Sequence, residues 1–134
     1  MAEKDYSGRP LIDKLGVKPG ARVATLGIAD TAFLESLAAR TDDSTEGRCP
    51  PDCDVILLGL ETVAELLQIE KCAKSLKPNG GLWVVYPKGR KDITQAHVME
   101  AGLAAGLVDN KVASFSTTLT AMRFVIRVKD RVKA

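Results

Sequence analysis

The feature that most constrains the fold is a set of three short, largely apolar runs, each followed by a segment with helical periodicity. The runs lie at about 22–26, 54–58 and 82–86. Continuous apolar runs without alternating polar residues are typical of parallel strands that helices cover on both faces. The strand–helix alternation therefore predicts a three-layer α/β sandwich with a mostly parallel sheet of about five strands.

Helices are expected after each of these runs, at about 31–39, 61–76 and 92–105. The spacing of apolar residues predicts a buried face for the second helix, made of Val63, Leu66, Leu67, Ile69, Ala73 and Leu76. Asp92, with Gln95 three residues on, resembles a capping pair at the start of the third helix. The turn-forming segment 77–81 is expected to end the second helix and reverse the chain.

The remaining strands, about 110–115 and 121–128, are joined by a connection of hairpin length. They are therefore expected to pair antiparallel. The 134 residues suffice for one domain with a modest core, and no change in composition divides the chain. We expect a single domain over 1–134, with an N-terminal helix and turn in 1–20 and a frayed tail at 129–134.

Charge and composition restrict the partners and the compartment. A net charge of +2 is weaker than the clustered basicity of dedicated nucleic-acid binders, so a nucleic-acid partner is not favoured. No apolar run approaches the ~20 residues of a membrane span, and the polar segment Met1–Asp5 does not resemble a signal peptide. Three cysteines suggest a reducing compartment, which predicts a cytoplasmic protein.

The loop after the first run, Gly27-Ile28-Ala29-Asp30, lies where α/β sheets bind ligands. Nucleotide-binding folds place two or three glycines there, so that the backbone can approach the cofactor. Here Gly27 stands alone, and Ile28 and Ala29 place side chains where a cofactor would lie. Asp30 could hold a ligand hydroxyl or amine, but the simpler interpretation is that Asp30 or Thr31 caps the following helix.

The polar segment 40–52 is long for a loop inside a domain, which indicates function, disorder or a lost element. Asp42 and Asp43 lie 15 and 16 residues after Gly27, short of the ~20 expected for an acid that binds a cofactor ribose. They could serve if a short strand survives there, and otherwise are solvated loop residues. We also expect this segment, or a second subunit, to cover the edge of the first strand.

A basic loop containing Lys88, Arg90 and Lys91 follows the third run and precedes a helix. Helix N–H groups and cations converge at such places and favour anions. This loop is the best ligand candidate by position and charge, either for a small anionic ligand or for an acidic partner surface. The alternative is a solvated basic loop.

The cysteines and the histidine do not form a pattern typical of a metal or catalytic site. Cys49 and Cys53 are four residues apart, but structural zinc requires four ligands, and only Cys72 and His97 remain. A Cys49–Cys53 disulfide is sterically feasible but unsupported in a reducing compartment. His97 has no evident acid–base partner, so we expect no metal and no catalytic constellation.

Several stretches resemble, in order, landmarks of class I S-adenosylmethionine-dependent methyltransferases: 15–23, 54–58, 76–84 and 101–103. The most specific is the Lys-Pro-Asn-Gly-Gly segment that enters an apolar strand. The resemblance implies a Rossmann-like fold with an antiparallel last strand, and S-adenosylmethionine as the cofactor to consider. Two departures weaken the implied site. The family's acidic residue and Gly-x-Gly are replaced by Thr25–Ala29, and only 40–52 stands where the family has two further strands and two helices.

More narrowly, the chain resembles a small bacterial family of uncharacterised proteins that look like truncated methyltransferases. The matching residues are Tyr6–Gly8, Pro10–Leu11, Trp83, Pro87–Lys88 and 101–108. The leading hypothesis is a non-catalytic methyltransferase-like domain that binds a protein partner, a second copy or a small anionic ligand. The alternative is a minimal methyltransferase that binds S-adenosylmethionine. The two differ in whether Gly27–Asp30 and Asp42 or Asp43 converge on one pocket.

Overall fold

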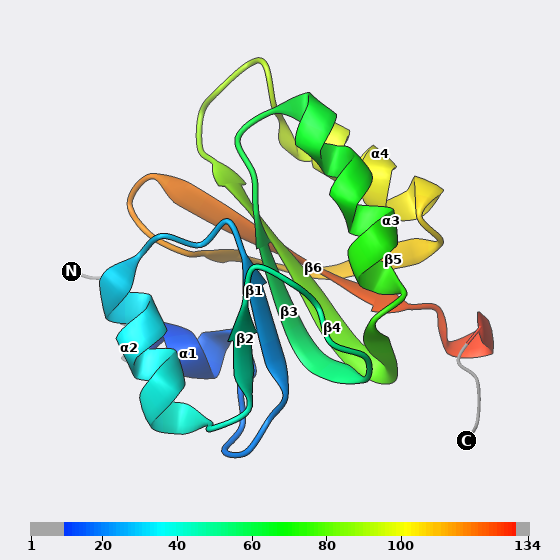
Figure 1. Ribbon diagram of the computed structural model, residues 1–134. Helices are drawn as coiled ribbons and strands as arrows, with labels where there is room; N and C mark the ends of the chain where they lie inside the picture. Colours follow the sequence, from blue (N-terminus) through cyan, green and yellow to red (C-terminus); the bar gives the residue numbers. More distant parts are fainter. Residues whose placement is uncertain (1–9, 131–134) are drawn as a thin grey trace.

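A computed structural model describes residues 10–130, which form a six-stranded sheet with helices on both faces (Figure 1). The strand order is β2-β1-β3-β4-β6-β5. The first four strands of this order run parallel, and β6 pairs antiparallel with both β4 and β5. The predicted three-layer α/β sandwich with a C-terminal antiparallel pair is confirmed, with six strands instead of about five. The elements are α1 (Leu11–Lys14), β1 (Val23–Leu26), α2 (Thr31–Arg40), β2 (Ser44–Glu46), β3 (Cys53–Gly59), the 3-10 helix η1 (Val63–Leu67), α3 (Gln68–Ala73), β4 (Leu76–Pro87), α4 (Gln95–Ala104), β5 (Leu107–Ser114), β6 (Leu119–Ile126) and the 3-10 helix η2 (Val128–Asp130).

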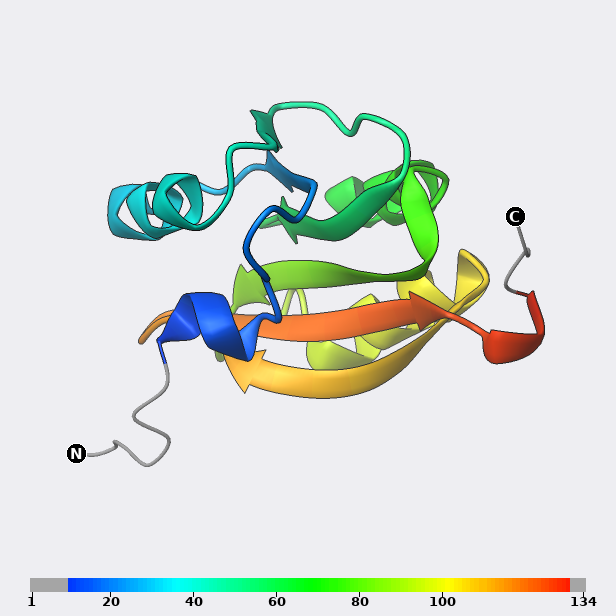
Figure 2. The same cartoon turned by 90° about the horizontal axis from the view of Figure 1, so that it is seen from below.

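The sheet separates two hydrophobic cores. Alternate residues of the central strands point to opposite faces: Leu57 belongs to the core beneath α1 and α2, and its neighbours Ile56 and Leu58 belong to the core beneath α3 and α4. Figures 1 and 2 show the two helix pairs on opposite sides of the sheet. Trp83 is buried in the α1–α2 core, where its Nε1 donates a hydrogen bond of 2.9 Å to the carbonyl oxygen of Leu15.

The segment 40–52 contains β2, which the sequence analysis left open. Its three residues pair in parallel with β1, from Val23 opposite Ser44 to Thr25 opposite Glu46. Only six residues, 47–52, then lead to β3, although a parallel crossover usually needs a dozen or more. The connection can be this short because β2 spans only three residues. The segment therefore covers the edge of β1, as expected.

The predicted helix 61–76 is in fact η1 followed by α3, and part of its predicted buried face is exposed. Val63 is 44% and Leu67 83% exposed, whereas Leu66 and Ile69 are buried. A 3-10 helix has three residues per turn instead of 3.6, so a face predicted with α-helical spacing drifts out of register over η1. Leu76 is buried as the first residue of β4.

Two further local predictions are corrected. The segment 77–81 lies within β4 as an irregularity, because Cys53 pairs with Leu76 and Val55 pairs with Gly81. α4 is capped by Thr94 and not by Asp92: Oγ1 of Thr94 accepts from the N–H of His97, and Nδ1 of His97 accepts from the N–H of Thr94.

The later start of α4 has a physical reason. Ile93, just before the cap, and Val98, at the fourth helical position, are buried in the same core. These are the two positions of a hydrophobic staple, which fixes the angle at which the chain enters a helix.

At the termini, α1 begins after Pro10 and ends before Gly16, within the segment 1–20 where a helix and turn are expected, while residues 1–9 lie outside the described residues. Lys129 and Asp130, expected to be frayed, belong to η2, and 131–134 are not described. None of the helices within 10–130 has the length and apolar character to cross a membrane.

Candidate functional site

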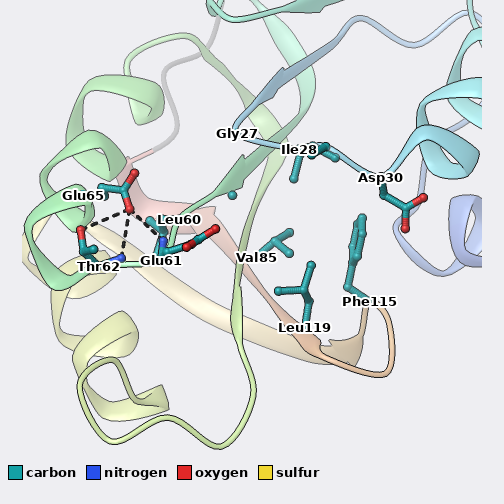
Figure 3. A pocket seen from close by; sticks show the side chains of 12 residues that line it. Gly27, Ile28, Asp30, Leu60, Glu61, Thr62, Glu65, Val85, Phe115 and Leu119 are labelled. Atoms are coloured by element: carbon teal, nitrogen blue, oxygen red, sulfur yellow. Dashed lines mark hydrogen bonds between the residues drawn. The ribbon is translucent and has the colours of Figure 1, made fainter.

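A cavity of about 470 Å³ opens at the carboxyl ends of β1 and β3 (Figure 3). The chain leaves β1 through α2 toward β2 on one side, and β3 lies on the other side, so the cavity is at the topological switch point of the sheet. Its lining comes from the loops after β1 and β3, from β4 and from the β5–β6 hairpin: Gly27, Ile28, Ala29, Asp30, Gly59, Leu60, Glu61, Thr62, Glu65, Val85, Phe115 and Leu119.

Two glycines bring the backbones of the β1 and β3 loops into contact beside the cavity. A Cβ atom on Gly27 would lie 2.4 Å from the carbonyl oxygen of Gly59, and a Cβ on Gly59 would lie 2.5 Å from that of Gly27. Gly27 also has a φ of +71°, which disfavours any side chain. Gly59 was not predicted from sequence, although a glycine that ends an apolar strand is a recognised signal of close backbone approach.

The wall of the cavity is apolar. Figure 3 shows Ile28 pointing from the β1 loop toward Val85, Phe115 and Leu119. Phe115 is held by a tilted contact with Phe33 of α2, with ring centroids 5.1 Å apart. The wall can therefore receive an apolar or aromatic group.

The charged part of the lining is entirely acidic. Asp30 lies on one side of the cavity, and Glu61 and Glu65 lie on the other (Figure 3). Glu65 Oε1 accepts hydrogen bonds from the N–H groups of Glu61 at 2.8 Å and Thr62 at 3.0 Å, and from the Thr62 hydroxyl at 3.2 Å. These hydrogen bonds lower the pKa of Glu65, and the bond from the Glu61 N–H has the largest effect. The Glu65 carboxylate is thus ionised at neutral pH, and the cavity favours positive charge.

Asp30 caps α2, which was the simpler of its two interpretations. Its Oδ1 accepts a hydrogen bond of 3.0 Å from the N–H of Phe33. Because Asp30 also lines the cavity, its negative charge lies beside any ligand there. Gly27, Ile28 and Asp30 are thus brought together, as the sequence analysis assumed for a ligand site.

Asp42 and Asp43 are not brought to this cavity. They lie just before the amino end of β2, where they line a separate hollow with Gly20 and Thr41. Asp43 Oδ2 accepts from Arg22 Nε at 3.1 Å. The acid at the carboxyl end of β2 is Glu46, which the sequence analysis passed over. It lies 19 residues after Gly27, closer to the ~20 that binds a ribose in dinucleotide folds, but it is exposed and does not line the cavity.

The basic loop after β4 does not contribute to the cavity either. Lys88 Nζ donates to Ser114 Oγ at 2.8 Å. Arg90 forms two hydrogen bonds with the carboxylate of Asp92, at 3.0 and 2.5 Å, and Lys91 is exposed. Binding of an anion or an acidic partner at this loop, and association with a protein partner or a second copy, remain predictions.

No protein-family model matches the chain, and no curated protein sequence matches it. Its structure, in contrast, is similar to several solved methyltransferases. A protein of Thermoplasma acidophilum assigned as a methyltransferase superposes with a TM-score of 0.66 at 11% identity, covering 96% of this chain and 78% of that one. A S-adenosylmethionine-dependent methyltransferase of Aquifex aeolicus gives 0.65 at 12% identity, covering 87% and 88%.

This chain has a methyltransferase-like Rossmann fold. The resemblance stated from sequence is confirmed at the level of the fold, and the identities are too low to carry more than that. CalO1, a methyltransferase of calicheamicin biosynthesis solved with S-adenosylhomocysteine bound, gives a TM-score of 0.63 at 15% identity over 87% of this chain and 52% of CalO1.

Proposed function

We propose that this methyltransferase-like domain binds a small cationic ligand of the S-adenosylmethionine class in the cavity at the ends of β1 and β3. We further propose that it acts by binding and not as a complete methyltransferase. The observation that carries the proposal is the lining of this cavity, which is apolar with carboxylates as its only ionisable groups among the described residues. The volume is within the range of small-molecule sites.

The lining fits the chemistry of this cofactor class. S-adenosylmethionine carries a sulfonium and an ammonium group, and the carboxylates of Asp30 and Glu61 would attract both. Its adenine and methylene groups suit the wall formed by Ile28 and Phe115. In support, NcsB1 of neocarzinostatin biosynthesis, solved with S-adenosylmethionine, shares the fold at a TM-score of 0.60 and 12% identity.

Two features favour binding over catalysis. Ala29 stands where the family loop has its second glycine, so the backbone contact that would orient the cofactor is lost while the apolar wall that includes Ile28 remains; this favours binding without the precise placement that group transfer needs. The six residues 47–52 also stand where the family has further strands and helices, which reduces the enclosure of a ligand. Group transfer depends on excluding water and holding the reactants in a near-attack geometry.

The test is a pair of calorimetric titrations at low salt, with S-adenosylmethionine and with S-adenosylhomocysteine, which lacks the sulfonium methyl and its charge. We expect S-adenosylmethionine to bind more tightly, by about fivefold for a unit charge near partly solvated carboxylates. Equal or tighter binding of S-adenosylhomocysteine would contradict the charge argument. No heat from either ligand at millimolar concentration would overturn the proposal.

Variants locate the binding within the cavity. Asp30→Asn removes the charge and keeps an oxygen that can cap α2, and Glu61→Gln removes the charge on the opposite side of the cavity. Each should weaken S-adenosylmethionine several-fold and leave S-adenosylhomocysteine nearly unchanged. Asp43→Asn is the matched control, because this carboxylate lies outside the cavity.

A further inference from the structure

Two cysteines from distant parts of the sequence lie side by side on the α3 face of the sheet. Cys49 belongs to the β2–β3 connection, and Cys72 lies near the end of α3. The Cys49 thiol donates toward the Cys72 sulfur, with 3.6 Å between the two Sγ atoms. Cys53, which the sequence placed with Cys49, is fully buried, and its Sγ instead donates to the carbonyl oxygen of Pro50 at 3.1 Å.

The pair is reachable from solvent. Cys49 is half-buried and Cys72 is 3% exposed, but both line a surface hollow of about 300 Å³. This hollow is distinct from the cavity at the ends of β1 and β3, and its lining also includes Arg48 and Lys71. A small oxidant can therefore meet both sulfurs.

The contact makes the two thiols unequal. The hydrogen bond from Cys49 lowers the pKa of Cys72, an effect that the Lys71 ammonium reinforces against the opposing influence of burial. The same hydrogen bond, followed by burial, raises the pKa of Cys49. Because the thiolate is the reactive form, this inequality favours Cys72 as the thiol that reacts first, with Cys49 beside it to form the disulfide.

We propose that Cys49 and Cys72 form a site of reversible oxidation by peroxides, whose product is a disulfide that ties the β2–β3 connection to α3. The Cys72 thiolate attacks one oxygen of hydrogen peroxide, the O–O bond breaks, and Cys72 sulfenic acid and hydroxide form. The Cys49 sulfur then attacks the Cys72 sulfur and displaces hydroxide. The thiol protons complete two waters, so two thiols are oxidised and one peroxide is reduced.

The geometry needs only a small movement. A disulfide requires an S–S distance of about 2 Å, and Cys49 lies in an irregular connection that can move toward α3. This connection is already bonded on both sides: Ser75 Oγ donates to the Cys49 carbonyl oxygen at 3.3 Å, and the Gly47 N–H donates to Thr25 at 2.8 Å. The disulfide adds a covalent link at that place and holds β2 against β1.

The first experiment treats the full chain with equimolar hydrogen peroxide, blocks the remaining thiols and maps the peptides. Cleavage after Arg48, Lys71 and Lys74 and before each aspartate separates Cys49 from Cys53. We expect peptide 49–51 linked to peptide 72–74. A link to Cys53, oxidation to sulfinic acid without a link, or unreacted thiols would overturn the proposal.

A second experiment needs no oxidant. Phenylarsine oxide binds stably only where two thiols lie within reach of one arsenic atom. The wild type and Cys53→Ala should each bind one equivalent, and a dithiol should release it. Cys49→Ser and Cys72→Ser should each bind none. Binding that survives loss of Cys49, or that requires Cys53, would contradict the assignment even if one variant folds poorly.

Discussion

Two loops at the same edge of the sheet differ in what they can do. The loop 27–30 follows β1 and the loop 88–92 follows β4, and each leads toward a helix. Each contains a glycine of nearly the same conformation, with φ of +71° at Gly27 and +70° at Gly89. Around Gly27 the chain touches the end of β3 and lines a cavity, whereas nothing lies within 4 Å of a Cβ built on Gly89.

The difference shows that charge and a position at the end of a strand do not by themselves make a site. The second loop carries three cations, yet none of them lines the cavity, and Arg90 is paired with Asp92 from the same loop. The first loop carries one charge, but Asp30 shares its cavity with Glu61, from the β3–η1 connection, and Glu65, from η1. Convergence of side chains from separate strands is what distinguishes the two loops.

The sharpest way to break this comparison is the same substitution in both loops. Gly27→Ala and Gly89→Ala each place a Cβ in the left-handed region, at a cost of about 1–2 kcal/mol. Only at Gly27 does the Cβ also meet a backbone oxygen, and such overpacking adds about 1–3 kcal/mol. We expect unfolding free energies lowered by about 3 kcal/mol for Gly27→Ala and about 1 kcal/mol for Gly89→Ala in urea titrations. Equal losses would mean that the Gly27–Gly59 contact relaxes freely.

A smaller effect is expected from the acids of the two loops. Asp30→Ala removes the cap of α2 and should lower the unfolding free energy by about 1 kcal/mol. Asp92→Ala removes an exposed ion pair within its loop and should lower the unfolding free energy much less than Asp30→Ala does. Asp30→Asn, which keeps the cap, should restore most of the stability. A larger loss of unfolding free energy for Asp92→Ala than for Asp30→Ala would contradict the conclusion that the acid of the first loop is the more important for stability.

Sequence alone predicted the elements that are specified locally. The run 54–58 is apolar after Asp54, and a hairpin-length connection leaves no choice but antiparallel pairing for the last two strands. β2 was not predicted because Ser44–Glu46 are three polar residues that hold their conformation through pairing with β1. The path of 61–76 was predicted wrongly because the same apolar residues are compatible with a 3-10 turn and with an α-helical turn, so the sequence did not distinguish η1 from a continuous α-helix.

The site was predictable only in its first loop. Gly27–Asp30 follow a recognisable strand, so their position at the ligand edge could be inferred. Glu61, Glu65 and Phe115 reach the same cavity from other elements, and their convergence depends on strand order. The Cys49–Cys72 contact depends likewise on the path of the connection, since 22 residues separate the two cysteines in sequence.

The smallest expected effect is a difference between Glu65 and Asp92 in how their contribution to stability depends on pH and salt. The hydrogen bond from the Glu61 N–H is the main cause that lowers the pKa of Glu65, and the hydrogen-bonded ion pair with Arg90 lowers the pKa of Asp92. A carboxyl group with a lowered folded pKa stabilises the fold above its unfolded pKa, and this contribution is lost as the pH falls through the folded pKa. Glu65→Gln and Asp92→Asn should each flatten the fall in urea midpoint below about pH 4.5. Added salt should reduce the Asp92 effect, because it screens exposed ion pairs, and should spare the Glu65 effect, which rests on backbone N–H donors. If salt reduces both effects equally, Glu65 is held by the field of distant charges and not by the β3–η1 backbone.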